Sequence, residues 1–314
     1  MSDNITSFEH GDSGADAPSP LSKPILEAVF QNADVSGLAV KSLINAVLMD
    51  SGDKPIGDVM SVIPELVHTE TSSRGYRIDV EAMTDSGEIA IVEVQLRQFA
   101  SMIERSLLYA EQALCGGAKR GMELSEVISA MPMVIAVNIL GKTVRSAGGF
   151  HQIAEVAYRE PPYERATDRF EIHNLELSKF RALGCVELNT PLQCWLAALC
   201  RSQDEKKALA EVVAMDNQLN AYYEHDPGFA QFVDRYGKVA ALPELRKAYR
   251  LWQIDMIVEK LEEERIAAKE AERAAKHADE LAKMEAALAA EREASAAKEA
   301  EIARLQALVD KRLV

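Results

Sequence analysis

The sequence predicts an α/β protein in which a mixed β-sheet is flanked by helices and is followed by a helical region and a long C-terminal helix. Residues 76–95 contain two β-type runs around a short turn, and residues 133–140 form a continuous apolar run rich in β-branched side chains. From residue 252 to the end there is neither glycine nor proline. Helical and strand patterns alternate before that point, as they do in a sheet covered by helices.

The composition is that of a soluble globular protein. The 314 residues, 48% hydrophobic and 27% charged, suffice for one large domain or two modest ones. No apolar run approaches the roughly 20 residues that a membrane span needs. The N-terminus lacks the basic-then-apolar order of a secretion signal, and the four cysteines form no CxxC pair. We therefore expect a cytoplasmic protein with reduced thiols and no membrane partner.

The net charge of −15 speaks against a simple nucleic-acid coat. The charge is unevenly distributed, however. Residues 71–150 carry 9 acidic and 8 basic side chains, which makes this stretch nearly neutral. A nucleic-acid partner is permitted by this distribution but is not indicated by it.

The N-terminal part begins with residues 1–22, whose Ser, Asp, Gly and Pro content predicts a disordered leader. A short helical pattern follows at 24–30, and residues 59–67 form an apolar segment that is a candidate first strand. Between them, a buried helix is predicted by apolar residues at helical spacing: Leu38, Val40, Leu43, Ile44, Val47 and Leu48.

The clearest local pattern is a hairpin. The β-type runs 76–83 and 88–95 flank the turn residues Thr84-Asp85-Ser86-Gly87. A helix is then expected over about 101–115. Residues 133–140 predict a buried central strand, and residues 170–177 predict a further strand.

The C-terminal half is predicted to be helical. Pro191, Pro227 and Pro243 divide residues 190–250 into shorter helices, whereas residues from 252 onward favour one long helix. Two clusters fit heptad a and d positions, Leu281, Met284 and Leu288, then Ile302, Leu305 and Val309. Polar residues at the corresponding positions between them, Glu291, Ser295 and Lys298, interrupt the seam, so a partial coiled coil is expected. The predicted domains are the leader 1–22, a core 23–181, a helical extension 182–251 and the charged helix 252–314.

The hairpin carries the side chains that could bind a metal ion or take part in catalysis. Glu93 and Gln95 project to one face of their strand, and Asp79 can lie opposite them across the hairpin, depending on the register. Two facing carboxylates repel unless a proton or a cation lies between them, and a hard divalent cation such as Mg²⁺ resolves that conflict. On spacing alone, a solvent-facing side of the hairpin explains the same residues and is the simpler interpretation.

Several motifs resemble, in their order, the PD-(D/E)XK nuclease family transposases, also called Rpn-type recombination-promoting nucleases. These motifs are Ser42–Leu48, Ile78-Asp79-Val80, Ile91–Gln95, Glu104–Tyr109, Met133–Leu140, Phe170–His173 and Glu176–Phe180. Each motif is only moderately specific, and their common order is the stronger argument. The likeness covers about residues 23–260. It implies a restriction-endonuclease-like fold, with residues 23–181 as the nuclease-like core.

The resemblance also implies metal-dependent hydrolysis of DNA phosphodiester bonds. Mg²⁺, or Mn²⁺ or Ca²⁺ in its place, would be held by Asp79, Glu93 and the carbonyl of Val94. The wider superfamily has lysine where this chain has Gln95, an amide that orients water but supplies no positive charge. Arg105 is a candidate source of that charge, and an exposed arginine on the helix face is an equally plausible interpretation.

Further assignments are weaker. Tyr109, Lys119 and Arg120 are candidate contacts for DNA, but a core tyrosine and a polar loop explain them as well. Glu27 matches the place of an extra acidic ligand in some relatives, and a solvated helix residue is the simpler interpretation.

Two functions follow from these assignments. The first is an endonuclease linked to recombination or to a mobile element. The alternative is a catalytically inactive nuclease-fold scaffold that assembles, as a homo-oligomer or with partners, through the C-terminal helix. The presence of both carboxylates favours the first, and the missing lysine and the acidic charge favour the second.

Overall fold

The computed structural model describes residues 16–30, 33–68, 76–97, 102–116, 121–184 and 187–310. The chain divides into two compact units, one up to Trp252 and one from Gln253. The predicted fold class is confirmed, because a mixed sheet with flanking helices is followed by a helical region and a long C-terminal helix.

The sheet has six strands in the order β1-β2-β3-β4-β6-β5. Strands β1, β2 and β3 pair antiparallel, β3, β4 and β6 run parallel, and β5 returns antiparallel to β6. The strands are β1 (Val59–His68), β2 (Tyr76–Thr84), β3 (Ile89–Gln95), β4 (Val134–Leu140), β5 (His151–Glu155) and β6 (Phe170–Glu176).

Most strands follow the sequence patterns. The hairpin of β2 and β3 matches the predicted runs 76–83 and 88–95 to within one residue, with Gly87 in the left-handed region at φ +90°. The ambiguous segment at 59–67 is a strand, and residues 170–177 form β6 except that Leu177 begins a helix. Strand β5 was not predicted, because its five residues at the sheet edge are largely polar and carry no alternating apolar pattern.

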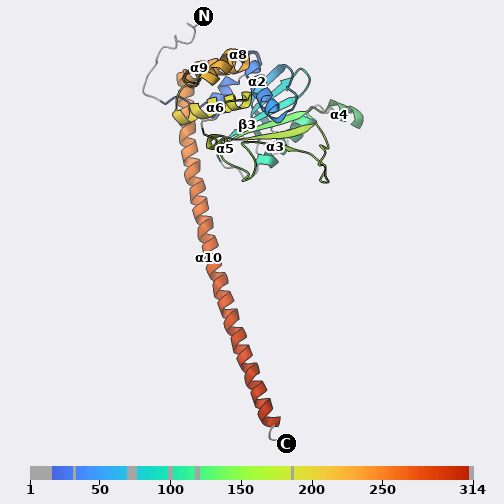
Figure 1. The fold of residues 1–314 in the computed structure, drawn as a ribbon, viewed down its shortest axis with the longest axis vertical. Helices are drawn as coiled ribbons and strands as arrows, with labels where there is room; N and C mark the ends of the chain where they lie inside the picture. Colours follow the sequence, from blue (N-terminus) through green and yellow to red (C-terminus); the bar gives the residue numbers. More distant parts are fainter. Residues whose placement is uncertain are drawn as a thin grey trace. The chain divides into compact units, whose positions relative to one another are not determined.

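Different helices cover the two faces of the sheet. One face, here the α2 face, carries Val80, Val92 and Val137, which share a core with α1 (Lys23–Val29), α2 (Ala33–Ser51) and α6 (Pro191–Glu205). The opposite α3 face carries Ile91, Ala136 and Ile172, which pack with α3 (Met102–Cys115). Figure 1 shows α2 and α6 on one side of the sheet and α3 on the other.

The packed part of the chain begins early. Of the predicted leader, residues 1–22, the first 15 lie outside the described residues. Leu21 and Ser22 are buried, and the Tyr236 hydroxyl donates a hydrogen bond to the carbonyl of Pro18. The ordered core therefore includes residues that were assigned to the leader from their composition.

The helical region packs onto the sheet within the same compact unit. Pro191, Pro227 and Pro243 are each the first residue of a helix, where a missing backbone N–H costs nothing. The side chains of Thr190, Asp216 and Asp226 cap the N-termini of α6, α8 and α9. The remaining helices are α4 (Leu124–Ala130), α5 (Leu177–Ala182), α7 (Leu209–Met215), α8 (Asn217–His225), α9 (Pro227–Ala240) and α10 (Pro243–Asp310).

Helix α10 spans 68 residues and confirms the expected long C-terminal helix, which begins at Pro243 rather than at Trp252. In its second unit the apolar side chains of Leu281, Met284, Leu288 and Ile302 are 43–61% exposed. The side chains of Leu305 and Val309 lie outside the described part. None of the described helices combines the length and the apolar character that a membrane crossing requires.

Candidate active site

Asp79 and Glu93 lie side by side where the ladder between β2 and β3 gives way to side-chain hydrogen bonds. Regular pairing runs from Met83–Ile89 to Val80–Val92. One residue further, Glu93 Oε1 accepts the backbone N–H of Asp79 at 3.2 Å, and Asp79 Oδ2 accepts the N–H of Val94 at 2.8 Å. Strand alternation places both carboxylates on the α3 face, opposite Val80 and Val92.

The site is buried, and its electrostatics are unfavourable for two negative charges. Asp79 is 9% exposed and Glu93 is 3% exposed. Burial, and then the negative charge of Asp79, raise the pKa of Glu93 from its ordinary value near 4.5 to about 8. The positive charges of Arg105 and Lys23 act in the opposite direction and offset only part of this rise. Near neutral pH the charge of the pair is therefore balanced either by one added proton or by a bound cation.

Helix α3 supplies the positive charge next to Glu93. The Arg105 Nη2 donates a hydrogen bond to Glu93 Oε2 at 2.8 Å, and its guanidinium lies 5.2 Å from the centre of the Tyr109 ring. Arg105 and Tyr109 are four residues apart and thus share one helix face. Tyr109 is fully buried, and burial together with the charge of Glu93 raises the pKa of its hydroxyl. The ring of the buried tyrosine thus packs against the guanidinium of Arg105 and helps to hold it in position.

A row of buried polar side chains continues from Glu93 across the sheet. The parallel register sets Glu93 beside Asn138 of β4 and Asn138 beside Asn174 of β6. Asn138 Nδ2 lies 2.9 Å from both Asn174 Oδ1 and Ser106 Oγ, and the Ser106 hydroxyl donates to the carbonyl of Met102. The row therefore ties the first turns of α3 to the sheet at the position of Arg105.

The other predicted residues are placed as follows. Gln95 ends β3 beside Leu140 of β4 and is partly exposed. The side chain of Val94 packs against the core on the α2 face, while its backbone N–H donates a hydrogen bond to Asp79. Lys119 and Arg120 lie outside the described residues.

Two residues near the site, Lys23 and Asn138, were not identified from the sequence. Lys23 of α1, which lies 3.4 Å from Glu27 in an ion pair, acts on the charge of Glu93. The i,i+4 spacing of Lys23 and Glu27 indicates an ion pair on α1. No sequence pattern, however, indicates that α1 lies near β3. Asn138 is the one polar residue in a strand whose other residues are apolar, and the sequence did not indicate a role for it.

The donor set suits a hard divalent cation. Two buried carboxylates, with the strand carbonyl of the residue that follows Glu93, provide the oxygen ligands that Mg²⁺ prefers, and burial together with their mutual repulsion raises the pKa of Glu93. We conclude that Asp79, Glu93 and Val94 fit such an ion by the chemistry of their ligand atoms.

The chain was compared with known protein families, curated proteins and solved structures. The sequence model of the PD-(D/E)XK nuclease family transposases matches residues 34–253. No curated protein and no solved structure matches the chain.

Proposed function

We propose that this chain, which belongs to the PD-(D/E)XK nuclease family transposases, is a Mg²⁺-dependent DNA endonuclease. The family implies a hydrolase of phosphodiester bonds that is linked to mobile elements. The observation that carries the proposal is the buried Asp79–Glu93 pair, in which each carboxylate accepts a backbone N–H of the opposite strand. Such a pair is costly for stability, and a catalytic role explains its retention.

In this mechanism Asp79, Glu93 and the carbonyl of Val94 would hold a divalent ion. When bound, that ion supplies charge neutralisation at the scissile phosphate and lowers the pKa of a coordinated water. Arg105 fixes the orientation of Glu93 through its 2.8 Å hydrogen bond. Tyr109 supports Arg105 from below, and Lys119 and Arg120 contact the DNA backbone.

Gln95 takes the position of the superfamily lysine. On the α3 face, strand alternation sets it two residues beyond Glu93, where its amide orients the attacking water. The positive charge that lysine would bring comes instead from Arg105 and Lys23, both of which act electrostatically on Glu93.

The test is cleavage of supercoiled plasmid in Mg²⁺, Mn²⁺ or Ca²⁺. Asp79→Ala is expected to lower the rate by at least about a thousandfold, because the loss of metal assistance amounts to several kcal/mol. Gln95→Lys, on the same face, is the matched control and is expected to keep or raise the rate. Equal cleavage by wild type and Asp79→Ala would refute the assignment of the site.

The second unit is proposed to mediate self-association. Leu281, Met284 and Leu288 are exposed at heptad spacing on α10, and the polar stretch that follows them limits the strength of any coiled coil. A chain ending at Trp252 is therefore expected to fold and to keep its cleavage activity but to lose self-association.

Sedimentation of the full-length and shortened chains measures this directly. Unchanged association of the shortened chain would exclude the role of α10. A full-length chain that associates but never cleaves DNA would favour the scaffold function instead.

A further inference from the structure

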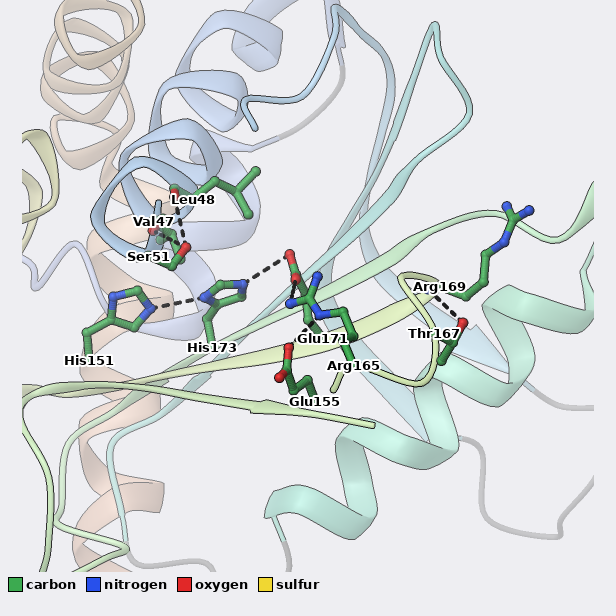
Figure 2. A network of polar contacts seen from close by, with 10 residues as sticks. All are labelled: Val47, Leu48, Ser51, His151, Glu155, Arg165, Thr167, Arg169, Glu171 and His173. Carbon is green, nitrogen blue, oxygen red and sulfur yellow. Dashed lines mark hydrogen bonds and ion pairs between the residues drawn. The ribbon is translucent and has the colours of Figure 1, made fainter. Parts of the chain in front are cut away.

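A second cluster of buried polar side chains lies on the α2 face of the sheet, opposite the carboxylate pair. His173 and Glu171 project from β6 on this face, and His151 projects beside them from β5. Figure 2 shows the side chains in a row, His151, His173, Glu171 and then Arg165. Glu171 is 1% exposed and His173 is 0% exposed. None of these residues is used in the proposed cleavage mechanism.

The contacts along this row are short and directional. Asp50, at the end of α2, places Oδ2 2.7 Å from His151 Nδ1. His151 Nε2 lies 3.0 Å from His173 Nδ1, and His173 Nε2 lies 3.3 Å from Glu171 Oε1. The second oxygen of Glu171 accepts a hydrogen bond from Arg165 Nη2 at 3.0 Å.

Counting hydrogens along the row reveals an unsatisfied position. A carboxylate only accepts hydrogen bonds, so His151 Nδ1 carries a hydrogen for Asp50. With one hydrogen on each ring, His173 Nδ1 donates to His151 Nε2, and His173 Nε2 is left as a bare lone pair. That lone pair faces a carboxylate oxygen that is itself only an acceptor.

The same two atoms are unsatisfied by geometry. Neither His173 Nε2 nor Glu171 Oε1 forms a hydrogen bond with the described part of the chain, although both are fully buried. Two buried acceptors that face each other are unfavourable unless a proton or a metal cation lies between them. Arg165 does not fill this role, because its contact is with the other oxygen of Glu171.

Asp53 completes a group of three metal ligands. It lies in the loop after α2, and its carboxylate, Glu171 and His173 offer ligand atoms that all lie within 4.8 Å of one another. Ligands at Zn–N and Zn–O distances of about 2.0–2.1 Å in a tetrahedral site are about 3.3–3.4 Å apart. The separation of His173 Nε2 and Glu171 Oε1, 3.3 Å, agrees with this spacing.

We propose that Asp53, Glu171 and His173 bind a divalent transition-metal ion of the zinc class. The imidazole ligand separates this site from the carboxylate pair, since Mg²⁺ prefers oxygen ligands only whereas zinc accepts nitrogen. Asp50 and His151 orient the ligand His173 through hydrogen bonds, the arrangement that typically supports a metal-bound histidine. The bound ion ties the loop after α2 to β6 and so stabilises the fold.

The site is tested by equilibrium dialysis with Zn²⁺ followed by elemental analysis. The protein used is the full-length Asp79→Ala variant, because it lacks a ligand of the proposed Mg²⁺ site. One Zn²⁺ per chain is expected, together with a rise in Tm. Co²⁺ in its place is expected to give the intense visible absorption of tetrahedral coordination.

Three variants in the same background separate a metal site from a structural role. Asp53→Asn is expected to weaken Zn²⁺ binding by more than about a hundredfold, the upper end of what loss of an outer partner costs. Asp58→Asn, an exposed acid in the same loop, is the matched control and leaves binding unchanged. Glu171→Gln is expected to raise the Tm of the metal-free protein, since the new amide donates to His173 Nε2, and to abolish the Zn²⁺-dependent rise.

The proposal is overturned if Asp79→Ala binds no Zn²⁺, or if Asp53→Asn and Glu171→Gln bind it as tightly as their background. It is also overturned if nitrogen NMR shows His173 doubly protonated in the presence of Zn²⁺, because a proton then takes the place of the ion.

Discussion

Replacing Glu93 by glutamine is expected to abolish DNA cleavage and, near pH 8, to raise the free energy of unfolding of the metal-free protein. The two effects have one cause. The carboxylate is needed in its charged form as a ligand, but burial and the charge of Asp79 disfavour that form and raise its pKa to about 8. A neutral isostere removes the ligand and the unfavourable charge together.

The pH dependence follows from the sign of the shift. Between the ordinary pKa near 4.5 and about 8, folded Glu93 holds a proton that the unfolded chain has released. Stability therefore falls as pH rises through this window, by at most about 1.4 kcal/mol per pH unit, and levels off above it. The variant lacks this loss, so its advantage over wild type grows from pH 4.5 to 8.

Urea unfolding in a chelator at several pH values measures the difference. Glu88→Gln, in the turn just before the same strand, is a control of opposite sign. Although burial raises the pKa of Glu88, hydrogen bonds from the hydroxyls of Thr84 and Ser86 lower it overall, so its neutralisation is expected to cost stability. An advantage of Glu93→Gln that does not change with pH would contradict the electrostatic account.

Replacing Trp195 by alanine is expected to destabilise the first unit by about 3–5 kcal/mol. Trp195 of α6 is 0% exposed, and its ring lies 5.1 Å from that of Phe229 and 4.9 Å from that of Phe232 on α9. Its indole N–H donates to the hydroxyl of Ser42 on α2 at 3.1 Å. The side chain therefore joins the helical region to the helix that covers the sheet.

Circular dichroism during urea unfolding measures this loss, and the sheet and the helices are expected to unfold in one transition. Trp252→Ala is the matched control. Trp252 is partly exposed and stacks only on Tyr249 at 5.8 Å among the described rings, so a much smaller loss is expected. Two separate transitions in a chain that ends at Trp252 and so lacks the second unit would show that residues 182–251 are an independent extension.

The features that could be predicted from the sequence are those with a local cause. Strand alternation and the short turn after Thr84 place Asp79 and Glu93 on one face, and the structure follows these rules. The prolines that begin α6, α9 and α10 and the long glycine-free segment are equally local signals. The order of the family motifs along the chain indicated the order of the helices and strands.

The remaining features depend on contacts between distant segments. Asn138 is read from sequence as one polar residue in an apolar strand, and its meaning appears only when Asn174 and Ser106 lie beside it. Likewise, His151 and His173 meet because β5 pairs with β6, and β5 has no pattern of its own. No spacing rule links Asp50 or Asp53 to residues more than 100 positions away.

The alternation of β6 has a consequence for how this protein tolerates change during evolution. Its consecutive residues His173 and Asn174 point to opposite faces, toward the histidine row and toward the row that leads to Arg105. A substitution affects one row at a time. A single-residue insertion or deletion in β6 would instead exchange the faces and disrupt both rows at once. Lineages of this chain are therefore expected to vary the length of their loops freely while conserving the length of this strand.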